Sequence, residues 1–72
     1  MPFTEKVWGL VKDATADLEN RNVIRFESSD DRDVFVLDCI DHFSWAHMHQ
    51  NADLNTIPDI VLDVAEVEGF AC

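Results

Sequence analysis

Apolar residues near the start of the chain recur with the period of a helix. They lie one, three and four positions apart, which places them on one stripe of a helix while the charged residues fall elsewhere. The stripe consists of Val7, Trp8, Val11, Ala14 and Leu18. Thr4 predicts the N-cap of this helix, and Asn20 and Asn22 predict its end. Gly9 lies inside it and costs up to about 1 kcal/mol relative to Ala, so the helix is either weakened there or closely packed by another element.

From residue 23 the period of the pattern changes to two. Ile24 and Phe26 alternate with charged residues, as expected of a half-buried strand. Residues 28–33 are rich in Ser and Asp, whose side chains satisfy nearby backbone groups in turns. Residues 34–40 are then apolar on both faces of a second strand. Such a two-sided apolar segment predicts the central strand of a sheet.

Residues 42–50 are compatible with two interpretations. As a strand, the segment groups Phe43, Trp45, His47 and His49 on one face, whereas in a helix its aromatic side chains diverge. A two-stranded hairpin is barely stable in water, while three strands packed by a helix can fold independently. We therefore predict a third strand here, with a helix as the alternative.

The last predicted element covers residues 58–68, after a polar turn at residues 51–55. Pro58 suits the first turn of a helix, and Gly69 followed by Phe70 suits a helix C-cap with a hydrophobic contact. The apolar residues of this element fall within one arc of a helical wheel. They are Ile57, Ile60, Val61, Val64, Ala65 and Val67. Their β-branched side chains leave a strand as the alternative.

Together these elements predict a small single domain, residues 1–72, of the α+β class. Its order is α-β-β-β-α, with an antiparallel three-stranded sheet packed by the N- and C-terminal helices. A chain of this length buries only about 60% of its unfolded surface, which argues against a deep enclosed active site.

The charge of the chain is strongly negative and unevenly distributed. The formal net charge is −10; residues 1–32 carry seven acids and five bases, and residues 33–72 carry eight acids and no Lys or Arg. A hydrophobic content of 47%, with five Phe and two Trp, is too high for a disordered acidic tail. The charge opposes direct binding of nucleic acid, whose affinity depends on Lys and Arg. It favours a basic partner instead.

Two groups of carboxylates are candidates for such an interface. Asp59, Asp63 and Glu66 are four and three positions apart, so a helix would align them with a charge about every 5 Å. One DNA strand carries a phosphate about every 3.4 Å. The second group lies in the predicted turn. The whole predicted acidic face comprises Asp30, Asp31, Asp33, Asp59, Asp63, Glu66 and Glu68. An ordinary solvated surface is the alternative, but such surfaces normally mix both signs of charge.

Metal sites and catalysis find little support in the sequence. His47 and His49 would point to the same side of a strand, and Cys39, His42 and Asp53 are possible further ligands of a zinc-like ion. No established metal motif accompanies them, so histidines packed at the rim of the core are favoured. The Asp-rich segment lacks the Gly and the late Glu of an EF-hand loop. Cys39 lies in an apolar run typical of a core residue. We therefore expect neither an enzyme nor a bound metal or cofactor.

The beginning of the chain lacks the basic start and apolar run of a signal peptide, and no apolar run is long enough to span a membrane. Cys39 and Cys72 do not form the spaced framework of a secreted disulfide scaffold. We expect a soluble cytoplasmic protein with reduced thiols and no membrane contact.

In its size, its charge and its acidic clusters, the chain resembles the small phage-encoded inhibitors that mimic DNA, such as anti-CRISPR proteins and the inhibitor of uracil-DNA glycosylase. The resemblance includes no motif that can be aligned, so it assigns no role to any residue. It implies an inhibitor in the host cytoplasm that occupies the basic groove of a nucleic-acid-binding protein, blocking target-DNA access to a Cas effector complex. The alternative is a generic interaction or dimerisation module whose acidity serves solubility. We expect a monomer or a weak homodimer.

Overall fold

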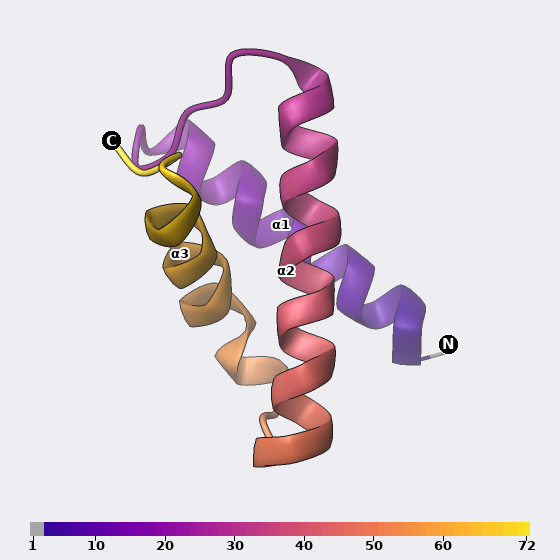
Figure 1. The fold of residues 1–72 in the computed structure, drawn as a ribbon. Coiled ribbons are helices and arrows are strands. Elements are labelled where there is room, and N and C mark those ends of the chain that lie inside the picture. Colours follow the sequence, from indigo (N-terminus) through magenta and orange to yellow (C-terminus); the bar gives the residue numbers. More distant parts are fainter. Residues whose placement is uncertain (1–2) are drawn as a thin grey trace.

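The computed structural model describes residues 3–72, and Met1 and Pro2 lie outside the described part. Its elements are the helices α1 (Phe3–Asn20), α2 (Ser29–Gln50) and α3 (Ile57–Glu68), with a short 3-10 helix, η1 (Leu54–Thr56), before α3 (Figure 1). Residues 3–72 contain no sheet and only one isolated antiparallel bridge, between Ile24 and Ala71. The predicted α+β fold with a three-stranded sheet is therefore wrong, and residues 3–72 form a bundle of three helices.

Helix α1 confirms the first predicted element. Val7, Val11 and Leu18 are buried, and the other two residues of the predicted stripe, Trp8 and Ala14, pack half-buried against the core. Thr4 lies inside the helix instead of capping it. Asn20 is the last helical residue, as predicted, and Asn22 takes a left-handed conformation with φ 60°. A Cβ added at Gly9 would meet open space, so no close packing explains this glycine.

Helix α2 begins where a turn was predicted. The Ser28 side chain accepts a hydrogen bond from the backbone N–H of Asp31 at 3.2 Å and so caps the helix. Asp30 and Asp31 lie in the first turn, where the helix dipole favours negative charge. Ser and Asp stabilise caps and turns by the same local hydrogen bonds, which is why residues 28–33 resembled a turn.

The two strands predicted at residues 34–40 and 42–50 are also wrong, since both segments belong to α2. For residues 42–50 the helical alternative is the correct one. The buried side chains of α2 follow helical spacing and are Phe35, Val36, Cys39 and Phe43. Residues 34–40 resembled a central strand because apolar side chains also occupy the outer side of this helix, where Val34 and Leu37 are exposed.

The strand predicted from residue 23 is wrong as well, although the segment does pair with another part of the backbone. The N–H of Arg25 donates to the carbonyl of Phe70 at 3.0 Å, and the N–H of Cys72 donates to the carbonyl of Val23 at 2.9 Å. The alternating pattern thus reflects a short pairing with the C-terminal residues, with Ile24 buried.

Helix α3 confirms the last predicted element and its helical interpretation. Pro58 lies in its first turn, and Gly69 caps its end in the left-handed conformation, with φ 84°. The predicted hydrophobic contact after the cap is also present. Phe70 packs against Phe26 and Phe35, with ring centroids 4.9 and 5.7 Å away.

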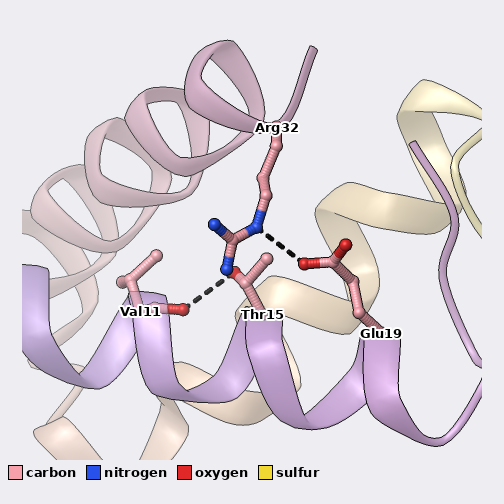
Figure 2. A network of polar contacts seen from close by, with 4 residues as sticks. All are labelled: Val11, Thr15, Glu19 and Arg32. Carbon is pink, nitrogen blue, oxygen red and sulfur yellow. Dashed lines mark hydrogen bonds and ion pairs between the residues drawn. The ribbon is translucent and has the colours of Figure 1, made fainter. Parts of the chain in front are cut away.

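All three helices contribute to one core. The largest fully buried side chains are Phe35, Phe43, Ile57, Val11, Val61, Val64, Thr15 and Cys39. Thr15 is the polar member, and its hydroxyl donates to the carbonyl of Val11 at 2.8 Å (Figure 2). Figure 1 shows α2 lying across the front of the bundle, with α1 crossing behind it and α3 running in the opposite direction beside it. The outward faces of α2 and α3 therefore remain available to partners.

Candidate acidic interface

The outward face of α3 carries the first group of predicted carboxylates. Asp59, Asp63 and Glu66 are all exposed, while Val61 and Val64 on the opposite side are buried. Their spacing of four and three places them on one stripe along the helix. The helical spacing predicted this exposed stripe, although Val67, which was placed in the apolar arc of the same helix, is 75% exposed.

Three of the five bases make contacts in a different region of the protein. Within residues 3–72 the two ion pairs join Arg21 to Asp17, at 3.3 Å, and Arg32 to Glu19, at 2.6 Å (Figure 2). Lys12 lies over the ring of Trp8, with its nitrogen 5.5 Å from the ring centroid. These contacts concentrate the opposite charges around α1 and the beginning of α2. Neither of these ion pairs involves a carboxylate of α3.

The second predicted group lies in the first turns of α2. Asp30 and Asp33 are exposed, and Asp31 is half-buried. Carboxylates at this position stabilise the helix through its dipole. These residues therefore have a structural role that does not depend on a binding partner. The beginning of α2 lies at the same end of the bundle as the end of α3 (Figure 1), in agreement with the contact between Phe35 and Phe70. The predicted residues therefore come from two helices, and the acids of α2 lie at the end of the bundle where α3 terminates (Figure 1).

Glu68, the last of the predicted residues, differs from the others because its carboxyl interacts with α2. Desolvation by partial burial, a side-chain hydrogen bond with Asp38 and the negative charge of Asp38 raise the pKa of Glu68, while nearby His42 lowers it. The protonated form of one carboxyl is needed to donate this hydrogen bond. Glu68 is therefore a contact between α2 and α3, and Asp38 is a partner that sequence reasoning missed.

The possible metal ligands are separated by the helical conformation. Residues two positions apart on a helix point about 200° apart, so His47 and His49 face different sides of α2. In the predicted strand they would have faced the same side. His47 donates from Nδ1 to the carbonyl of Ala52 at 2.8 Å and stacks on Phe43, whereas His49 lies beside Trp45. Within residues 3–72 no group of three or more His, Cys, Asp or Glu side chains is arranged to hold a metal ion.

The buried Cys39 is not an activated nucleophile. Cys39 is buried, and neither it nor the exposed Cys72 forms a disulfide within the described chain. Desolvation by burial, reinforced by the negative charges of Glu68 and Asp38, raises the pKa of the Cys39 thiol to about 12. A thiol in this environment stays protonated at neutral pH and does not react. Cys39 is a core residue, as predicted.

Two further surface features became visible only with the helical conformation of α2. One is an open groove of about 320 Å³ between α1 and α2, lined by Trp8, Lys12, Arg32, Asp33, Val36 and Leu37. The other is the outward side of α2, where large apolar side chains are exposed. They are Val34, Leu37, Trp45 and Met48. Plotting residues 29–50 on a helical wheel would have placed these four residues on one side of the helix.

The chain was compared with family models, curated proteins and solved structures, and none of them matches. Among residues 3–72 no helix has both the length and the apolar composition needed to cross a membrane.

Proposed function

We propose that this protein binds a basic surface of a nucleic-acid-binding protein and inhibits it by presenting carboxylates where phosphates would lie. The observation that carries the proposal is the outward stripe of α3, in which Asp59, Asp63 and Glu66 are exposed and no base lies in the same half of the sequence. Such a stripe attracts a cationic groove, speeds association and repels nucleic acid itself.

The spacing of these carboxylates supports the comparison with phosphates. On a helix they are separated by about 6 and 4.5 Å along the axis, against about 3.4 Å between phosphates of one DNA strand. The acids at the beginning of α2 extend the negative surface at the end of the bundle where α3 terminates. A Cas effector complex is one partner of this kind, and blocking its access to target DNA is the corresponding mode of inhibition.

The proposal is tested by titrating the purified protein against a panel of Cas effector complexes and a uracil-DNA glycosylase. We expect at least one member of the panel to bind the protein and to release it when duplex DNA is added. Binding should be markedly weaker at 500 mM than at 50 mM salt, since salt screens exposed charges beyond a Debye length of about 10 Å at 0.1 M. Binding that DNA does not displace, or no binding at all, would contradict the proposal.

A second candidate function is a self-association module. The exposed apolar side chains on the outward side of α2 favour it, because they are not explained by an electrostatic interface.

A further inference from the structure

The outward side of α2 carries four exposed large apolar side chains in one stripe. The exposed fractions are 56% for Val34, 49% for Leu37, 56% for Trp45 and 75% for Met48. Asp41, also exposed, lies in the middle of this stripe. A single exposed apolar residue is ordinary, but a helix that is apolar on its inner and its outer side is normally covered on both. We call these five residues the α2 stripe.

The spacing of the α2 stripe is symmetric about Asp41. Its members follow one another at intervals of three, four, four and three residues, so the pattern is the same in either direction along the helix. When two such helices lie antiparallel with a two-fold axis at Asp41, Val34 of each copy is level with Met48 of the other. Leu37 is then level with Trp45 of the other copy. Each level pairs a branched aliphatic side chain with a longer or aromatic one.

We propose that the α2 stripe is the contact surface for a second copy of this chain, with the two α2 helices antiparallel. A two-fold dimer requires a surface that complements itself, and the symmetric spacing supplies this property. A parallel pair would instead oppose Trp45 to Trp45 and Val34 to Val34, which matches the side-chain volumes less well. The antiparallel arrangement also aligns the two helix dipoles favourably.

The position of α2 leaves room for this contact. Figure 1 shows α2 at the front of the bundle, with α1 and α3 behind or beside it, so no described element covers its outward side. From Val34 to Met48 the stripe extends for about 21 Å along the helix axis. One pair of helices in contact over this length buries less than the roughly 1,200 Å² of a standard stable interface. The dimer is therefore weak and depends on the protein concentration.

Charge opposes the dimer and determines how it responds to salt. Each copy has a formal net charge of −10, and Asp41 would lie opposite its own counterpart at the two-fold axis. Salt screens this repulsion but leaves the apolar contact intact, so added salt should strengthen self-association. A complex with a basic surface should respond in the opposite direction. This inference does not rest on the proposed function, and the two can fail separately.

Disulfide trapping tests the register. In a Cys72→Ser background, Val34→Cys and Met48→Cys chains are mixed in equal amounts and oxidised gently. We expect the mixed disulfide between the two variants to exceed both homodisulfides. In the antiparallel register two copies of residue 48 lie about 21 Å apart along the axis, far beyond the roughly 7 Å between Cα atoms that a disulfide allows. Statistical mixing of the three products, or an excess of homodisulfides, would overturn the register.

Sedimentation velocity of the unmodified sequence tests the dimer itself. We expect the average mass to rise with concentration up to about 1 mM, and to rise further when NaCl is increased from about 0.1 to 1 M. Met48→Gln should lower this self-association at least threefold. Val67→Gln is the matched control, because Val67 is also 75% exposed but lies on α3. A monomer under all conditions, or an equal effect of the two variants, would overturn the proposal.

Discussion

The outward faces of α2 and α3 differ in the kind of contact that each can make. The outward face of α3 presents Asp59, Asp63 and Glu66, whose charges act over several ångströms and are weakened by salt. The α2 stripe presents mainly apolar surface, which acts only in direct contact and persists in salt. Two helices of one small bundle thus offer a long-range electrostatic surface and a short-range apolar one.

This difference has its origin in how each helix packs. Helix α3 buries Ile57, Val61 and Val64 on one side, and its exposed side carries mainly carboxylates, with Val67 as one exposed apolar side chain. Helix α2 buries Phe35 and Phe43 but keeps apolar side chains on its opposite side as well. Covering an exposed apolar side chain with another surface lowers the free energy, so the second pattern indicates an interaction surface.

The largest expected effect is a loss of binding when the charge of α3 is reversed. Asp63→Lys together with Glu66→Lys places cations against the cations of a basic partner, where like charges cost several kcal/mol and 1.4 kcal/mol is already tenfold in affinity. We expect affinity for the member of the panel that binds the protein to fall more than tenfold. The melting temperature should stay the same or rise, because these side chains are exposed and self-repulsion decreases.

The control for this variant changes the net charge by the same amount elsewhere. Glu5→Lys together with Asp13→Lys alters two exposed positions of α1, the helix near which the bases lie. We expect a much smaller change in affinity. Equal losses in the two double variants would mean that total charge, and not the α3 stripe, makes the contact.

The second effect concerns the α2 stripe. Trp45→Gln removes a half-exposed aromatic side chain that occurs twice in a symmetric dimer, and each large apolar side chain contributes about 1.5–3 kcal/mol when fully buried. We expect self-association, measured by sedimentation, to weaken about tenfold or more. The salt dependence of binding to a basic partner should remain unchanged. A change in that salt dependence would show that the two faces are not independent.

A smaller effect, of opposite sign, is expected at the centre of the stripe. Asp41→Asn removes the repulsion between the two copies, which amounts to about 1 kcal/mol for unit charges 4 Å apart in water. Self-association should strengthen severalfold and become less sensitive to salt. Asp63→Asn removes the same charge from α3 and is the control; if it strengthens the dimer equally, the effect is one of net charge alone.

The smallest effect lies at Glu68, where α2 and α3 meet. Folding raises the pKa of Glu68, so the folded state favours the protonated carboxyl. The folded state therefore loses stability as the pH rises from the ordinary pKa of a Glu side chain through the raised pKa of Glu68. Glu68→Gln should therefore increase the melting temperature at pH 7 and have no effect below about pH 4. Because solvent screens this exposed group, the increase should not exceed a few degrees. A destabilised variant at pH 7 would contradict the assigned direction.

The sequence by itself determined the two helices whose buried residues form one regular stripe. In α1 and α3 a single stripe of buried residues shows the helical period, and Asn20 and Gly69 mark the ends as predicted. The sequence also determined the excess of acids after Arg32 and the stripe formed by Asp59, Asp63 and Glu66. All of these features depend on residues close together in the chain, whose spacing can be read without knowing what lies opposite.

The conformation of α2 was decided only by the tertiary structure. Apolar residues on both of its sides, such as Phe35 and Leu37, hide the helical period, so a two-sided strand fitted residues 34–40 as well. The backbone pairing of Arg25 with Phe70, and the contact of Glu68 with Asp38, join residues far apart in sequence. Such contacts form only when the three helices pack, because the free energy that selects them comes from burying surfaces of different helices against one another.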